Sequence, residues 1–390
     1  MNTFLRSAFL ALSLVFIVSA IAPVEAEVLV LRTPDGGLQP RLVNGQDGSV
    51  HLLYFKKRIT APSAREGNLY YREFLADERR FGLPVKVSST AYDLQTFAIS
   101  RAAMAVDGAG RVHVLWYRPR INQFFYSRSD AQRSSFEVQR AMVSDFAEGI
   151  DAAGDVAARG NEVALLWGAG ALSAEESRTV YARFSQDGGE VFGPELQVGD
   201  QDLGACACCS LAGEFDAAGA LHVAYRSAID GTGRHMQLLT LHSSAPSLAE
   251  AGETLRGDYA PLQPLQEWDM SSCPLSTNDF ALDSQGETWA AFETAARVVR
   301  LKEGEAAQTV AGPATPTRQK NPAIAVAQDG SVLTAWGEAI SHSKGGLLNA
   351  QLEDAEGRKS AWRLAEEWTL PKFSFPAAAA LGESDFLLVW

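Results

Sequence analysis

The chain has 390 residues, of which 46% are hydrophobic, and its formal net charge at pH 7 is −13. Because no run of basic residues interrupts this acidic balance, nucleic acid is excluded as a partner on electrostatic grounds. The length is ample for a large core, and no segment after the N-terminal one is long and apolar enough to predict a membrane span.

The first 26 residues are typical of a secretory signal peptide. Arg6 precedes an apolar run over residues 8–22, and the segment ends in the small residue Ala26. We therefore expect cleavage after residue 26, a periplasmic or secreted location, and a mature domain over residues 27–390. An uncleaved anchor is the alternative. Export also permits disulfide bonds.

Internal repetition is the main structural signal of the mature chain. A small-residue strand, a tight turn with Gly or Asp-Gly, and an alternating strand recur about every 56 residues. Each copy ends on an aromatic residue, and these residues are Tyr54, Trp116, Trp167, Tyr225, Phe292, Trp336 and Trp390. This grammar predicts a β-hairpin in each copy, and further strands are readable after most of them.

The repeat predicts an all-β fold, a β-propeller of four-stranded antiparallel blades. Small residues suit the innermost strands, which crowd around the axis, and large aromatics suit the space between blades. The last copy contains only two strands, and a spare strand over residues 27–32 can complete it and close the ring. Seven blades are favoured, and six with an irregular terminal hairpin are the alternative. We expect a monomer.

Two arginines are candidates for binding an anion. Arg41 and Arg101 each precede a turn aspartate, Asp47 or Asp107, by six residues, so we expect them at one repeat position on neighbouring inner strands. The alternative is a structural role in which they pair with adjacent carboxylates.

One turn carries a family signature. The segment "YARFSQDGGEVFGP" contains Ser185, Asp187, Gly189 and Phe192 in the spacing S-x-D-x-G-x-x-F. It resembles the Asp-box of sialidase-like (BNR-repeat) β-propellers, in which the Ser and Asp side chains bind nearby backbone and Gly permits positive φ. The resemblance implies a sialidase-like propeller over residues 27–390 and a structural role for these four residues.

The resemblance does not extend to sialidase chemistry. Sialidases of this fold grip a substrate carboxylate with three arginines and use a Tyr nucleophile activated by a Glu. Here the Arg-Ile-Pro motif is absent, and no third arginine falls at the predicted position of Arg41 and Arg101. We therefore expect no sialidase activity. An exo-sialidase or another glycoside hydrolase of the superfamily is the alternative.

The four cysteines of the chain form two groups. Cys206, Cys208 and Cys209 lie in "GACACC", and Cys273 follows much later. Cys206 and Cys273 each stand ten residues before a turn aspartate, so we expect them at equivalent entrances to adjacent inner strands. A bridge between Cys208 and Cys209 or between Cys206 and Cys208 is tight, whereas Cys206–Cys209 or a bridge to Cys273 is easier.

Three uses of the cysteines remain open: a disulfide staple, a metal site, or a redox function. Thiolates would select copper, as Cu(I), or zinc, and Met270 is a candidate further soft ligand. A Cys-x-Cys-Cys cluster with a distant Cys-Pro resembles a pattern in exported bacterial BNR-repeat proteins.

Three functions are compatible with these features. The first is a non-catalytic module that binds a small ligand, glycan, metal or protein partner on the face around the axis. The second is the glycoside hydrolase. The third is a structural or assembly factor that handles metal through its cysteines.

Overall fold

The computed structural model describes residues 26–60, 65–94, 101–151, 153–171, 173–206, 208–241, 258–261, 268–312, 317–341, 345–363 and 369–390. Residues 1–25, which make up nearly all of the predicted signal peptide, lie outside the described residues. No helix of the described part is long and apolar enough to cross a membrane.

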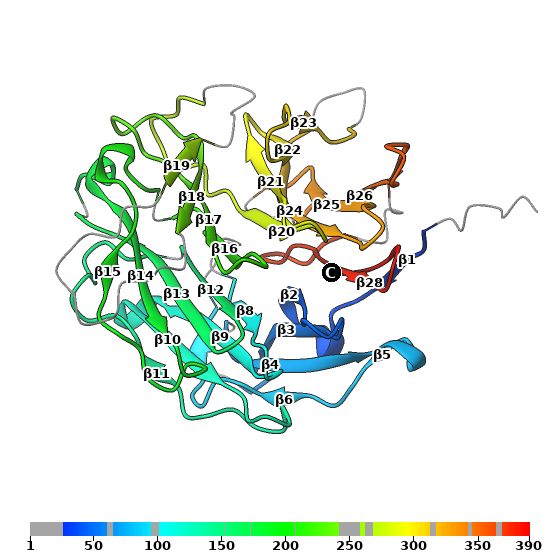
Figure 1. Cartoon of the computed structure of the whole chain (residues 1–390), viewed down its shortest axis with the longest axis horizontal. Helices are drawn as coiled ribbons and strands as arrows, with labels where there is room; N and C mark the ends of the chain where they lie inside the picture. Colours follow the sequence, from blue (N-terminus) through cyan, green and yellow to red (C-terminus); the bar gives the residue numbers. More distant parts are fainter. Residues whose placement is uncertain are drawn as a thin grey trace, which may run out of the picture.

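The chain folds into a β-propeller of seven sheets, which confirms the seven-bladed architecture (Figure 1). The sheets follow one another around the ring in chain order, from blue to red in Figure 1. The first strands of neighbouring sheets contact each other all the way round, including β28 with β2, so the ring is closed.

Five sheets have four strands in simple antiparallel order. The second, third and fourth sheets are formed by β8 (Ala103–Val106), β9 (Val112–Arg118), β10 (Gln123–Arg128) and β11 (Arg140–Ala141); β12 (Gly154–Arg159), β13 (Glu162–Ala169), β14 (Thr179–Ser185) and β15 (Leu196–Gln197); and β16 (Ala212–Phe215), β17 (Leu221–Arg226), β18 (Met236–Leu241) and β19 (Asp258–Pro261). The fifth and sixth are formed by β20 (Asn278–Leu282), β21 (Thr288–Thr294), β22 (Arg297–Lys302) and β23 (Gln308–Thr309); and β24 (Gln319–Val326), β25 (Val332–Glu338), β26 (Leu347–Glu353) and β27 (Lys359–Arg363).

The first sheet carries extra short strands at its outer edge. It consists of β2 (Leu38–Asn44), β3 (Val50–Lys57), β4 (Glu66–Leu75), β5 (Arg80–Phe81), β6 (Val85–Lys86) and β7 (Tyr92–Asp93). Short 3-10 turns connect strands around the ring: η1 (Pro34–Gly36), η2 (Ala76–Glu78), η4 (Pro119–Ile121), η5 (Glu175–Ser177) and η6 (Gln201–Leu203).

The seventh sheet is closed by the N-terminal strand, as the spare strand predicts. β28 (Ala377–Leu381) and β29 (Asp385–Val389) form the hairpin of the last copy, and β1 (Val28–Leu31) pairs with β29. The pairing of β1 is parallel, with Val28 opposite Phe386 and Leu31 opposite Val389. This sheet therefore has three strands and one parallel pair rather than four antiparallel strands.

The aromatic residue that ends each copy packs between sheets. All seven of these residues are buried, and small residues are frequent in several first strands, such as β8 and β28. Ala103 and Ala105 of β8 pack with Leu115 of β9 and Val156 of β12, for example, in a core shared by two blades. Burial of such side chains is the main favourable contribution to folding, at roughly 25 cal/mol for each Å² of apolar surface removed from water.

Candidate functional site

The predicted cysteine residues come together at the entrances of two adjacent inner strands. Asp216 and Asp283 begin equivalent turns, since their backbone N–H groups donate to Ala220 O and Glu287 O at 2.9 and 3.0 Å. Cys206 before β16 and Cys273 before β20 therefore hold the same repeat position in neighbouring blades.

The four sulfur atoms form one cluster. Cys208 and Cys273 are joined by a disulfide bond between the two blades, while Cys206 and Cys209 are free thiols. The Sγ atom of Cys206 lies 3.0 Å from that of Cys209, 3.6 Å from that of Cys208 and 3.4 Å from that of Cys273. The Sγ atoms of Cys209 and Cys273 are 3.8 Å apart. None of these sulfur contacts involves Met270.

Hydrogen bonds hold the two loops that carry the sulfurs. Cys206 N–H donates to Arg226 O at 2.9 Å, and Cys209 N–H donates to Cys206 O at 3.1 Å. On the other loop, Leu275 N–H donates to the Sγ atom of Cys273 at 3.3 Å. The Ser276 hydroxyl donates to the Sγ atom of Cys209 at 3.7 Å and so links the two loops.

Three buried cations surround the cluster. Arg226 donates from Nε to Ser276 Oγ at 2.9 Å, beside Cys209. Lys320 donates from Nζ to the carbonyls of Pro274 and Leu275 at 2.9 and 2.8 Å, in the loop of Cys273. Arg234 donates to Glu175 Oε2 at 2.6 Å.

Two carboxylates complete this shell. The other oxygen of Glu175 lies 3.9 Å from the Sγ atom of Cys208. Glu293 is fully buried, and its carboxylate lies 3.4 Å from Lys320 Nζ. The shell therefore carries three positive and two negative side chains, an arrangement that favours a negatively charged sulfur cluster.

The surroundings shift the pKa values of the two free thiols in opposite directions. Burial raises the pKa of Cys209, but the hydrogen bond from Cys206, the Arg226 charge and Ser276 outweigh it and lower that pKa to about 6. The hydrogen bond to Cys209, together with burial, raises the pKa of Cys206. The hydrogen bond between the two thiols and the Arg226 charge therefore favour a thiolate on the Cys209 side of the pair.

The arrangement fits a soft metal ion once the disulfide is reduced. Cys206, Cys208 and Cys273 have sulfur atoms that lie within 4.8 Å of one another, and Cys209 lies on the same cluster. A tetrahedral zinc site with Zn–S bonds of about 2.3 Å needs sulfurs about 3.8 Å apart. The observed sulfur contacts, from 3.0 to 3.8 Å, are close to this spacing.

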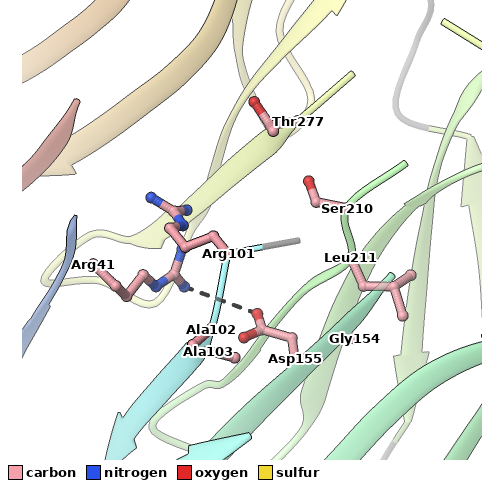
Figure 2. A pocket seen from close by; sticks show the side chains of 9 residues that line it. All are labelled: Arg41, Arg101, Ala102, Ala103, Gly154, Asp155, Ser210, Leu211 and Thr277. Atoms are coloured by element: carbon pink, nitrogen blue, oxygen red, sulfur yellow. Dashed lines mark ion pairs between the residues drawn. The ribbon is translucent and has the colours of Figure 1, made fainter. Parts of the chain in front are cut away.

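The predicted arginine pair lies in a pocket on the propeller axis (Figure 2). The pocket is small and open to solvent. Arg41 and Arg101 reach into it, with Asp155 beside them and the hydroxyls of Ser210 and Thr277 across the pocket.

The two arginines do not share a repeat position, so that expectation is wrong. Arg41 lies opposite Leu53, the residue directly before the aromatic Tyr54. In the second blade, the residue opposite Leu115, directly before Trp116, is Ala103. Arg101 therefore lies two positions earlier than Arg41. The first hairpin turn begins at Gly45, which donates to Ser49 O, but the second begins at Asp107 itself. Counting back from the turn aspartates consequently gave a shifted register.

The guanidinium of Arg41 already forms ion pairs with two carboxylates of the protein. Its Nη1 donates to Asp279 Oδ1 at 2.8 Å, and its Nη2 lies 3.8 Å from Asp155 Oδ2. Asp155 and Asp279 stand at the same strand level as Arg41, in the third and fifth blades. These ion pairs agree with the structural alternative for Arg41.

Arg101 is bound less closely. Its Nη2 lies 3.7 Å from Asp279 Oδ1, its Nη1 donates to Pro40 O at 3.4 Å, and its guanidinium lies 4.8 Å from the centre of the Phe375 ring. Burial and the neighbouring charge of Arg41 lower the pKa of Arg101 to about 10.

A further acid faces the same charges. Burial raises the pKa of Glu214 to about 8, although Arg41 acts in the opposite direction. The raised pKa favours the neutral form of the Glu214 side chain near neutral pH. The axial group then balances two guanidinium groups against the carboxylates of Asp155 and Asp279.

The sulfur cluster and the axial pocket share a wall. Ser210, which lines the pocket, directly follows Cys209, and its N–H donates to Ser276 O at 3.2 Å. Its hydroxyl donates to Asn278 Oδ1 at 3.0 Å in the next blade. The cysteine cluster and the pocket are therefore connected by two consecutive residues, Cys209 and Ser210.

The residues of the predicted Asp-box form one compact turn after β14. Ser185 Oγ donates to Asp187 Oδ1 at 2.6 Å and accepts from Gly189 N–H at 2.9 Å. Asp187 Oδ1 also accepts from the N–H groups of Glu190 and Val191, both at 3.0 Å. Phe192 is buried against Tyr126 of the preceding blade. The turn lies at the end of the hairpin and is separate from the cysteine cluster.

Several residues of the site were not predicted from the sequence. Asp279 could have been found by counting back from the aromatic that ends each copy, because it precedes Phe292 by 13 residues, as Arg41 precedes Tyr54. Asp155 precedes Trp167 by 12 residues and coincides with Arg41 only because the turn of the third blade is shorter. The charged shell of the cluster had no such signal, since its members come from separate loops and strands: Glu175, Arg226, Arg234, Glu293 and Lys320.

Comparisons with known proteins show similarity of fold only. No family model matches the chain. No curated protein matches it either. A fungal alcohol oxidase of the AA5 family in complex with copper is 12% identical, with a TM-score of 0.49, over 88% of this chain and 69% of its own.

Two further solved structures have similar values. The six-bladed fucose-recognising lectin of Aleuria aurantia is 8% identical, with a TM-score of 0.47, over 86% of this chain and 96% of its own. A Hadza microbial sialidase is 12% identical, with a TM-score of 0.45, over 84% of this chain and 66% of its own. At these identities and scores, none of the three assigns a function.

Proposed function

We propose that this protein is an exported, metal-binding β-propeller whose reduced cysteine cluster holds one soft metal ion, Cu(I) or Zn(II). The observation that carries the proposal is a group of sulfurs from two blades: the Sγ atoms of Cys206, Cys208 and Cys273 lie within 4.8 Å of one another, and that of Cys209 lies 3.0 Å from Cys206 and 3.8 Å from Cys273. Cys206, Cys208, Cys209 and Cys273 would supply the thiolates. A site on two hydrogen-bonded loops that lead into adjacent inner strands is well suited to bind a metal ion without rearrangement of the fold.

The charged shell supports this assignment. Thiolate complexes of Cu(I) or Zn(II) carry a net negative charge, and Arg226, Arg234 and Lys320 lie around the cluster with only Glu175 and Glu293 to oppose them. Among the described residues, Arg234 Nε and Nη1 are buried without a hydrogen-bond partner. Unpaired buried guanidinium donors are costly unless negative charge lies nearby.

The proposal does not include sialidase activity. Arg41 is bound to Asp279 at 2.8 Å, so this guanidinium is already neutralised by the protein. Arg101 lies at a different strand level from Arg41 and packs on Phe375. The pair therefore resembles an internal charge network more than a clamp for a substrate carboxylate.

The test is metal binding by the reduced protein. Mature protein that has been reduced and desalted without oxygen is titrated with Cu(I) or Zn(II) against a chromophoric chelator, and bound metal is counted by elemental analysis. We expect one ion per chain. The double variant Cys206→Ser/Cys209→Ser should bind at least about 100-fold more weakly, because half of the ligands are lost.

A matched control removes a buried sulfur elsewhere. Met104→Leu alters the core of the second blade, far along the chain from the cysteines, and should leave metal affinity unchanged. Met270→Leu tests the predicted thioether ligand separately. Absence of bound metal from the reduced wild-type protein, or equal affinity in the double cysteine variant, would contradict the proposal. A circular dichroism melt of each variant shows whether the propeller is intact.

A further inference from the structure

The sulfur cluster has an accessible side and a buried side. Cys206 and Cys209 are 4% and 2% exposed, whereas the bonded residues Cys208 and Cys273 are partly exposed. A reagent that arrives from solvent therefore meets the disulfide first. The two thiols lie behind it and are shielded from direct oxidation, which is consistent with free thiols beside a disulfide.

The disulfide withholds half of the metal ligands. A sulfur atom in a disulfide is not a thiolate, so the cluster with Cys208 and Cys273 bonded offers only the thiols of Cys206 and Cys209. Reduction of that one bond doubles the number of thiol ligands. The backbone that presents them is already in place, since the Sγ atom of Cys206 contacts the other three sulfurs before reduction.

We propose that the Cys208–Cys273 disulfide exchanges with an external dithiol reductant, and that this two-electron reduction switches the cluster from a weak two-thiol site to a four-thiol metal site. This inference rests on the proposed metal-binding function. The partner is a dithiol, either a small molecule or a protein with two neighbouring cysteines. It is recognised by access to the exposed face of the disulfide.

The exchange proceeds in two steps. One thiolate of the reductant attacks the Sγ atom of Cys208 or Cys273, forms a mixed disulfide, and releases the other cysteine as a thiolate that takes up a proton. The second thiol of the reductant then attacks the mixed disulfide. The reductant leaves as a disulfide, and Cys208 and Cys273 have together gained two electrons and two protons.

Buried cations accommodate the reduced state, while the Glu175 carboxylate beside Cys208 acts against it. Glu175 lies 3.9 Å from the Sγ atom of Cys208, and Arg234 binds that carboxylate with one nitrogen while Nε and Nη1 remain without a partner among the described residues. Lys320 holds the carbonyls next to Cys273. New thiolates at Cys208 and Cys273 would therefore arise beside donors that are already buried there.

The experiment compares metal affinity before and after reduction of the folded protein. Oxidised mature protein is treated with dithiothreitol, or with a reduced thioredoxin-fold protein, in the absence of denaturant and is then desalted without oxygen. Thiols are counted by mass spectrometry after alkylation in denaturant. We expect two thiols before treatment, four afterwards, and at least about a 100-fold rise in affinity for Cu(I) or Zn(II).

The double variant Cys208→Ala/Cys273→Ala is the control for gating. It keeps the two buried thiols and has no disulfide, so its metal affinity should match that of the oxidised wild-type protein within about threefold and should not respond to reductant. A melt followed by circular dichroism confirms that it is folded. If this variant is unfolded, the more conservative double variant Cys208→Ser/Cys273→Ser, measured in the same way, serves in its place.

The outcomes separate the two proposals. If neither the oxidised nor the reduced protein binds metal, the metal-binding function fails. If both bind with equal affinity, or if the disulfide resists the dithiol until the protein unfolds, the gating fails while the metal site stands. Only four thiols with strengthened binding in the reduced protein support both.

Discussion

Individual residues of the site depend on neighbours that are distant in sequence. Arg41 binds Asp279, which lies 238 residues away along the chain, and the axial position of both residues removes them from bulk water. The same environment acts on Glu214, whose carboxyl group faces Arg41, Asp279 and Asp155. Burial favours its neutral form, because few donors compensate the loss of hydration.

Glu214 should make stability depend on pH. Its folded-state pKa of about 8 lies above the ordinary value of 4.5, so the folded protein binds the additional proton between these limits. The stabilisation that this proton gives to the folded state is fully present below about pH 4.5 and is lost as the pH rises through about 8. Glu214→Gln should therefore stabilise the protein more, relative to wild type, at pH 9 than at pH 5.

Urea unfolding at pH 5, 7 and 9 measures this difference. We expect the advantage of the variant over wild type to grow by about 1 kcal/mol or more across the range. Glu190→Gln is the matched control, because it removes a carboxylate that is 71% exposed. Equal pH profiles for wild type and Glu214→Gln would show that the Glu214 carboxyl group is not buried as described.

At the scale of single elements, turns set the register of the strands. The turn after β14 places Gly189 at φ 77°, and a Cβ atom there would lie 1.9 Å from the Tyr126 hydroxyl of the preceding blade. That hydroxyl is also 2.6 Å from His113 Nδ1, in a buried contact within the second blade. The predicted Asp-box turn therefore joins two blades as well as two strands.

Gly189→Ala should destabilise the protein for two reasons. Positive φ disfavours any L-residue, and the methyl group clashes with Tyr126, so we expect the free energy of unfolding to fall by about 3 kcal/mol in urea denaturation. Gly188→Ala is a close control: its φ is 67°, but the nearest atom to the new Cβ is 3.5 Å away. That variant should lose only about 1 kcal/mol. Similar losses in both variants would argue against the clash.

At the scale of the whole molecule, the ring makes distant segments neighbours. β1 pairs with β29 and closes the seventh sheet, and β28 contacts β2 on the inside of the ring. The same closure sets Arg41 of the first blade against Asp155 and Asp279 of the third and fifth. The axis is thus held by ion pairs between blades that are not adjacent.

Deletion of β1, residues 28–31, should weaken the closed ring. The edge of β29 would lose its ladder partner and present free backbone groups, so we expect a melting midpoint lower by roughly 5 °C or more and association detectable by light scattering. Arg79→Ala removes an exposed ion pair of the adjacent Glu27 without touching the ladder and should change neither property. A monomeric deletion variant with the wild-type midpoint would contradict the role of β1.

The repeat in the sequence determined the all-β class, seven blades, the burial of one aromatic per copy, and the pairing of the N-terminal strand with the last hairpin. These features are predictable because strand alternation and turn composition are local and recur along the chain. The same register placed Cys206 and Cys273 at equivalent positions, since both are counted from turns that begin alike.

Only the tertiary structure decided which side chains meet. The bonding of Cys273 to Cys208, the shell of Arg226, Arg234 and Lys320, and the neutralisation of Arg41 by Asp279 all join separate blades or loops. The two-position shift between Arg41 and Arg101 arose from the start of one turn. Contacts of this kind depend on ring closure and on exact loop paths, which a local and periodic pattern does not encode.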